Sequence, residues 1–192
     1  MQSDDFRTAS VSRRRLLVRT ALALAMPASA RAGTPAFREI SWDDLMPKDW
    51  DPMKEMNGRI AGIVSDGDPR ALKLQQDMRR IWDSAPTVPA LDGASVKLPG
   101  YVVPLEEAKG GLREFLLVPY FGACIHVPPP PANQIVLVVP KEAVKGFRTM
   151  DTVWVSGTLQ SARSASAMGA SGYRMTAAIV EPYVTPQRGN TR

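Results

Sequence analysis

The residues best suited to chemistry lie in one short segment, residues 118–134. Cys124 is the only cysteine of the chain and His126 its only histidine, and they stand two positions apart. In an extended segment, side chains two positions apart point to the same face. A thiolate and an imidazole on one face are ligands that suit zinc or Cu(I). The spacing predicts a small metal site, with zinc expected first and copper as the alternative.

Three interpretations of this pair stay open. As metal ligands, the two residues are too few for a closed zinc site, which takes four. The others would come from Glu106 or Glu107, from water, or from the same pair of a second subunit in a homodimer. As a catalytic pair, Cys124 would be a nucleophile activated by His126, with only Asn133 nearby to orient the ring. As structural residues, the cysteine would be a small buried apolar group and the histidine a hydrogen-bonded one.

The neighbouring residues are suited to holding such a site in place. Gly122 frees the backbone just before the cysteine, and four prolines at 128–131 favour a stiff polyproline II path. Seven methionines follow residue 32, but their scattered, core-like positions give them little weight as copper ligands. Further candidate site residues are Glu106, Tyr120, Asn133 and Gln134, the last two because amide side chains bind nearby backbone groups.

The candidate segment is predicted to join two β-strands. Five runs rich in β-branched and aromatic residues are separated by turn signals. They predict strands at residues 94–103, 113–120, 134–139, 152–158 and 172–180. Lys141–Lys145 is predicted to form one helical turn between the third and fourth strands. The expected fold class is therefore mostly β, a small OB-like five-stranded barrel, with another small sandwich or barrel as the alternative.

Residues 33–95 are predicted to form an N-terminal extension with one helix at about residues 69–82. Pro69 suits a first helical turn, and apolar residues recur near helical spacing after it. They are Leu72, Leu74, Met78, Ile81 and Trp82. Ser41–Leu45 predicts a shorter helical turn. The barrel domain is expected at residues 96–185, with a loop at Ser161–Ser171, and a tail at 186–192.

The first 32 residues are typical of an export signal. A polar lead reaches Arg13-Arg14-Arg15, an apolar run follows over Leu16–Met26, and small-residue triplets end at Ala30 and Ala32. The run is shorter than the roughly 20 residues that span a bilayer. The arginines and the apolar residues after them resemble a twin-arginine signal, and an ordinary Sec signal is the alternative. We expect a periplasmic protein cleaved near Ala30 or Ala32.

Composition excludes some classes of function. The chain carries a formal net charge of +5, but residues 1–32 hold six arginines and only two aspartates. Without them the net charge is +1, so the mature protein lacks the electrostatic footprint of a nucleic-acid-binding protein. No second apolar run predicts a transmembrane segment. A single cysteine cannot form an internal disulfide.

The central segment also resembles a known family. Gly100–Glu106 and Phe115–His126, followed by the prolines and Asn133-Gln134, are similar to an uncharacterised family of bacterial periplasmic proteins, one of the numbered domain-of-unknown-function groups. The resemblance covers about residues 39–183. Members are often encoded beside ABC-transporter components, some in zinc-responsive cassettes, which implies metal handling or transporter support. The resemblance brings no established enzymatic activity with it. The positions that match its signature are Cys124, His126, Glu106, Pro128 and Asn133.

Taken together, these features predict a non-enzymatic, soluble periplasmic binding or accessory protein whose Cys124 and His126 bind a metal ion. The alternative is a protein-interaction module that docks on an ABC-transporter or other envelope partner, with both residues structural. That alternative predicts exposed apolar side chains around Tyr120, Phe121 and the prolines.

Overall fold

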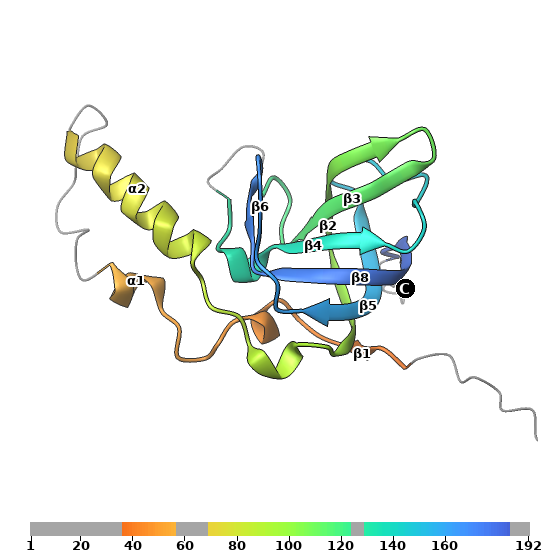
Figure 1. The fold of residues 1–192 in the computed structure, drawn as a ribbon, viewed down its shortest axis with the longest axis horizontal. Coiled ribbons are helices and arrows are strands. Elements are labelled where there is room, and N and C mark those ends of the chain that lie inside the picture. The colour runs from red at the N-terminus through yellow and green to blue at the C-terminus, as the bar shows by residue number, and fades with distance from the viewer. Residues whose placement is uncertain (1–35, 57–68, 124–128, 185–192) are drawn as a thin grey trace, which may run out of the picture. The chain divides into compact units, whose positions relative to one another are not determined.

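The structure is a computed structural model that describes residues 36–56, 69–123 and 129–184. Five strands form a closed barrel (Figure 1). They are β2 (Ser95–Ala108), β3 (Gly111–Val118), β4 (Val136–Pro140), β5 (Thr152–Gln160) and β8 (Tyr173–Pro182). The order is β2-β3-β4-β8-β5, and pairing of β2 with β5 closes the barrel. Because β4 and β8 run parallel while the other barrel pairs are antiparallel, the sheet is mixed. The predicted five-stranded barrel is confirmed.

The long strand β2 makes closure possible because it serves two neighbours. Its first half, Ser95–Tyr101, pairs with β5, and its second half, Tyr101–Ala108, pairs with β3. Gly100 stands at the change of partner, where a Cβ atom would lie 2.8 Å from the Leu117 side chain. The close approach of the β2 backbone to β3 at this point therefore requires a glycine.

Smaller elements differ more from expectation. The segment expected as a loop contains a hairpin of β6 (Ser164–Ser166) and β7 (Gly169–Ser171), and β1 (Arg38–Glu39) pairs in parallel with β2. The helical turn predicted at Lys141–Lys145 is wrong. Val144 instead exchanges backbone hydrogen bonds of 2.8 and 3.0 Å with Leu112 of β3, so its N–H and C=O groups are taken by a bridge between strands.

Strands β3 and β4 are apolar on both faces, and this creates two apolar clusters. Phe115 and Leu117 of β3 belong to the main core inside the barrel. Leu116 and Val118 alternate with them and belong to a second cluster. Besides these two, the second cluster contains Val103, Ala123, Ile135 and Leu137, with Tyr101, Leu105, Val139, Met150 and Met168 packed against it. Since a strand alternates its side chains between faces, this second cluster lies on the outer face of β2, β3 and β4.

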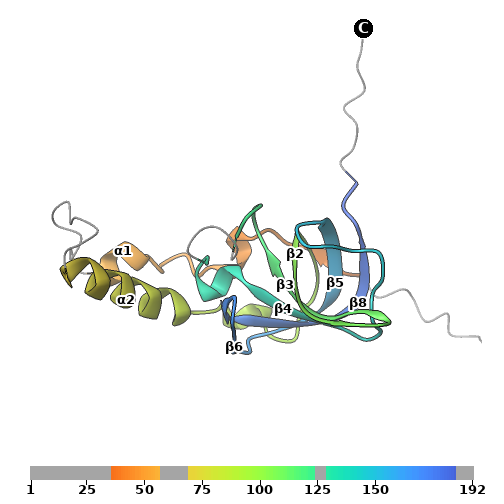
Figure 2. The same cartoon turned by 90° about the horizontal axis from the view of Figure 1, so that it is seen from above.

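The N-terminal extension forms part of the barrel core. Its helices are α1 (Pro52–Glu55) and α2 (Pro69–Asp83), which confirms the predicted helix, and its 3-10 turns are η1 (Asp43–Leu45) and η2 (Pro89–Leu91). A third turn, η3 (Ala132–Gln134), precedes β4. Leu45 and Leu91 are buried in the main core, and Figure 2 shows η1 beside the strands. In the described part of the chain, no helix is long and apolar enough to cross a membrane.

Candidate functional site

The candidate site belongs to the connection between β3 and β4, residues 119–135. Cys124 and His126 themselves lie outside the described residues. On one side of them, Gly122 and Ala123 are buried, and on the other side Pro130 is buried. Gly122 has φ 83°, in the left-handed region, which a glycine adopts at low cost. Both described ends of the connection are therefore anchored in the protein.

Two contacts hold these ends. Ala123 packs into the second apolar cluster, so the first end lies against the outer face of the barrel. At the other end, the backbone of Gly169 in β7 approaches Pro129 so closely that a Cβ atom would lie 3.2 Å from the proline ring. The β6–β7 hairpin thus supports the proline run at the point where it returns to the barrel.

Met150 is a neighbour of this segment that sequence reasoning passed over. Its Sδ lies 3.4 Å from the Gly122 nitrogen, two residues before Cys124. Met150 has φ 67°, which is rare for a residue other than glycine. Its N–H donates to the Val102 carbonyl at 2.7 Å, and Val102 N–H donates to the Asp151 carbonyl at 3.0 Å. No local signal in the sequence marks this contact, because it joins residues 28 positions apart.

Asn133 and Gln134 bind backbone groups, as expected, and their partners lie in the N-terminal extension. Asn133 Nδ2 donates to the Pro86 carbonyl at 3.0 Å, and Gln134 Nε2 donates to the Trp42 carbonyl at 2.8 Å. Asn133 is fully buried, and its Oδ1 has no hydrogen-bond partner in the structure. A buried acceptor without a partner is costly, and this one lies within the β3–β4 connection itself.

Glu106 lies away from Val118, where the described part of β3 leads into the connection. It is exposed on β2, opposite Glu114 in the register, whereas Tyr101 pairs with Val118, the last residue of β3 before the connection. At the rise of a strand, the five steps from Tyr101 to Glu106 span about 16 Å. Within the described ranges, no three His, Cys, Asp or Glu side chains gather as a metal site would require.

Two exposed aromatic side chains lie at the start of the connection. Phe121 is 70% exposed and Tyr120 45% exposed. The Phe121 ring meets Tyr101 of β2 edge to face, with centroids 6.1 Å apart and an interplanar angle of 81°. This geometry is one that aromatic pairs prefer. It holds Phe121 at the surface next to the buried Ala123.

Two titratable groups with shifted pKa values belong to the extension and its attachment. Burial raises the pKa of Tyr173, against an opposing hydrogen bond from the Val88 N–H. The Tyr173 hydroxyl also donates to the Leu45 carbonyl at 2.9 Å. Hydrogen bonds from the backbone and side chain of Ser41 lower the pKa of Asp44. The Tyr173 contacts tie the extension to β8, and the Asp44 contacts stabilise the turn η1.

Comparison with known proteins places the chain in a family. The family described as "Protein of unknown function (DUF3299)" matches residues 42–182. A DUF3299 family protein from Pseudomonas aeruginosa PAO1, known from a crystal structure, is 41% identical, with a TM-score of 0.61 over 79% of this chain and 99% of that chain. No curated protein matches the sequence. Sequence and fold agree on one assignment: the chain belongs to the DUF3299 family, whose function is unknown.

Proposed function

We propose that this protein is an exported periplasmic binding or accessory protein that binds a soft or borderline metal ion, zinc in the first place, through Cys124 and His126. One observation carries the proposal. The only cysteine and the only histidine directly follow a buried alanine in a connection anchored at both described ends. Anchored ends limit the entropy that the connecting residues lose when they close around an ion.

The described surroundings offer groups that fit such an ion. The Met150 thioether is a soft metal ligand, and its Sδ lies against the Gly122 nitrogen. Cys124 is two residues further along the chain, and consecutive Cα atoms are about 3.8 Å apart. A thioether beside a thiolate favours Cu(I), which keeps copper as the alternative. The unpartnered Asn133 Oδ1 is an acceptor of the kind that orients a metal-binding imidazole through its second N–H.

The chain's own residues would have distinct roles. Cys124 would supply the negative charge and His126 a neutral nitrogen, which together suit an ion that must later be released. With few protein ligands, the site would stay open to water or to a partner, as an accessory protein that hands metal to an ABC transporter requires. The proposal assigns no catalytic step to the pair.

The decisive measurement is calorimetric titration of the protein beginning at Gly33 with Zn²⁺ and, under reducing conditions, with Cu(I). We expect one site, weakened at least tenfold in Cys124→Ser and His126→Ala. Met150→Leu should weaken Cu(I) more than Zn²⁺, while Met78→Leu on α2 is the matched control. Equal affinity in the parent protein and both ligand variants would sink the idea.

A second candidate function is favoured by the exposure of Phe121. The interaction-module alternative expects apolar side chains at the surface here, and Phe121 and Tyr120 are both exposed. A large aromatic ring at the surface is a usual anchor of a protein interface. In this case Phe121 would dock on an envelope or transporter partner and Cys124 would be structural.

The two candidates are separated by a photo-crosslinking residue placed at position 121 in living cells. The interaction module predicts a crosslink to one envelope protein that survives Cys124→Ser and His126→Ala. If the protein acts through its metal site, the crosslink should be lost in both variants. Absence of any crosslink to a defined protein would reject the docking function.

A further inference from the structure

Helix α2 packs its apolar side chains against the protein only incompletely. Among residues 70–83, Asp77 alone is buried. The apolar stripe formed by Ala71, Leu74, Met78, Ile81 and Trp82 spans an arc of about 100°, yet each of these residues is only partly buried. Leu72 lies outside the stripe and is 62% exposed, and Met53 of the contacting helix α1 is 59% exposed. The two helices therefore present large aliphatic side chains to solvent.

Basic side chains surround these apolar ones. Helix α2 carries four basic residues (Arg70, Lys73, Arg79 and Arg80) against two acidic ones (Asp77 and Asp83). Asp77 is paired with Arg80, and Asp83 accepts a long contact of 3.7 Å from Arg79. Two open hollows of about 490 and 480 Å³ flank the helix, and each is lined by three basic side chains and one aspartate. Their size and charge suit phosphate-bearing headgroups.

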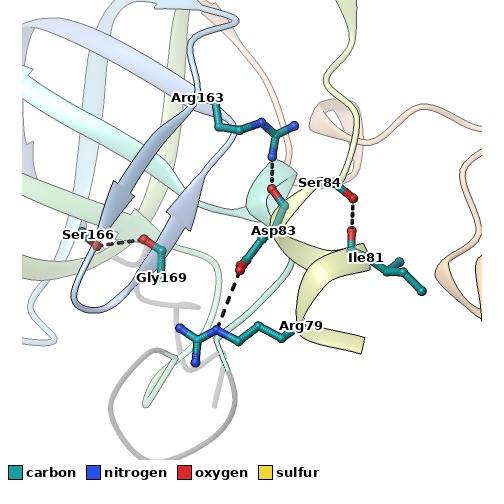
Figure 3. A network of polar contacts seen from close by, with 7 residues as sticks. All are labelled: Arg79, Ile81, Asp83, Ser84, Arg163, Ser166 and Gly169. Atoms are coloured by element: carbon teal, nitrogen blue, oxygen red, sulfur yellow. Dashed lines mark hydrogen bonds and ion pairs between the residues drawn. The ribbon is translucent and has the colours of Figure 1, made fainter. Parts of the chain in front are cut away.

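The C-terminal end of the helix is fixed to the barrel. Figure 3 shows the Arg163 guanidinium donating to the Asp83 carbonyl oxygen, and its other nitrogen donates to the Ala85 carbonyl at 3.0 Å. Arg163 directly precedes β6, and α2 also contacts β7. This arginine satisfies carbonyl groups after the last helical turn, so its charge is used for attachment.

We infer that α2, with Met53 of α1, docks the protein on an anionic lipid surface. Lys73 would contact the phosphates, as would the guanidinium nitrogens of Arg79 and Arg80 that do not bind Asp83 and Asp77. Leu72 and Met53 would enter the boundary between headgroups and acyl chains. Charge complementarity selects this occupant: the surplus of basic side chains is concentrated on one exposed helix of a mature chain whose net charge is only +1. Basic helices with exposed apolar residues bind anionic membranes in this way. The inference is separate from metal binding and uses none of its residues.

The test is cosedimentation with vesicles of pure phosphatidylcholine and with vesicles containing phosphatidylglycerol, at low and high salt. We expect binding only to the anionic vesicles, and loss of most of it at high salt because exposed charges are screened. Because the first 32 residues are themselves basic and apolar, the full chain and the chain beginning at Gly33 are both measured. Inorganic phosphate, added as competitor, should displace little protein if a lipid surface is the ligand.

Matched variants assign the binding to the helix. Removing one basic side chain near the surface should weaken it about fivefold, so Lys73→Gln combined with Arg79→Gln should weaken it more than tenfold. Leu72→Ser should weaken it severalfold. Controls of the same chemistry are Lys141→Gln, exposed after β4, and Ile179→Ser, exposed on β8. Circular dichroism of each variant checks that the fold is retained.

Several outcomes would overturn the inference. Equal binding to neutral and anionic vesicles would show that charge is not the determinant. Equal losses in helix and control variants would remove α2 as the site. Full displacement by inorganic phosphate would make the ligand a free anion. A lower oligomeric state of the α2 variants in analytical ultracentrifugation, without vesicle binding by the parent, would make the occupant a second copy of the chain.

Discussion

At the scale of single residues, side chains of the barrel attach the N-terminal extension by binding its backbone. Asn133, Gln134, Arg163 and Tyr173 each donate to a carbonyl of residues 42–86. Backbone groups of an irregular segment have no ladder to satisfy them. The two amide side chains therefore hold the extension in place, while the buried Asn133 Oδ1 makes no hydrogen bond in the structure.

The Tyr173 hydroxyl bonds two backbone groups of the extension. Tyr173→Phe leaves the Leu45 carbonyl and the Val88 N–H without their partner, so we expect a loss of about 1–3 kcal/mol near pH 7. Because burial raises the pKa of Tyr173, its stabilising effect is complete below the unfolded value near pH 10 and is lost as the pH rises through the folded value. The variant should therefore show less alkaline destabilisation than the parent.

Urea denaturation between pH 7 and pH 11 measures both effects. Tyr183→Phe, at the exposed end of β8, is the control that keeps the composition the same. A Tyr173→Phe variant as stable as the parent at pH 7 would contradict the assigned hydrogen bonds.

At the scale of elements, the barrel depends on a few close approaches of backbone. The β2–β3 turn ends at Gly111, which has φ 120° and whose Cβ, if present, would lie 2.3 Å from the Val144 carbonyl oxygen. Val144 also forms the backbone bridge with Leu112 that the structure has in place of the expected helical turn. Two successive glycines are a local turn signal, but Val144, which the backbone of Gly111 approaches, is 33 positions further along the chain and has no local signal in the sequence.

The neighbouring glycines allow a matched comparison. Gly111→Ala should cost about 2–3 kcal/mol because it combines a strained φ with a clash against backbone. Gly110→Ala, whose Cβ would meet nothing closer than 3.9 Å, should change the free energy of unfolding by less than about 0.5 kcal/mol. Thermal unfolding followed by circular dichroism measures the difference, and equal effects at both positions would argue against the Leu112–Val144 bridge.

At the scale of the whole molecule, the fold begins well before the barrel strands. Ile40 and Leu45 are buried in the main core, and the Trp42 indole N–H donates to the Pro99 carbonyl at 2.7 Å. The boundary predicted at residue 95 therefore separates the extension from the strand-rich part of the sequence, but both contribute side chains to the same core. Extension and barrel should unfold together as a single cooperative unit.

Truncation tests this cooperativity. A chain that begins at Gly33 should keep the parent's unfolding midpoint, since every described core residue remains. A chain that begins at Pro47 loses Ile40, Trp42 and Leu45 and should unfold at a much lower temperature or fail to fold, as loss of several buried side chains costs well over 4 kcal/mol. Calorimetric scans of the two chains suffice, and a cooperative, unshifted transition in the shorter chain would refute the shared core.

The sequence by itself determined the elements whose signals are local. Alternating or continuous apolar runs located the five strands, spacing and Pro69 located α2, and the placement of Cys124 and His126 between two strands followed from the same patterns. Tertiary structure alone decided what lies beside that connection, because contacts such as Met150 with Gly122, Gly169 with Pro129 and Arg163 with α2 join residues far apart in the chain. Periodicity shows which face of an element is apolar, whereas only packing shows what covers it. Ala123, Met150 and Met168 pack into or against the outer cluster, and the stripe of α2 remains partly exposed.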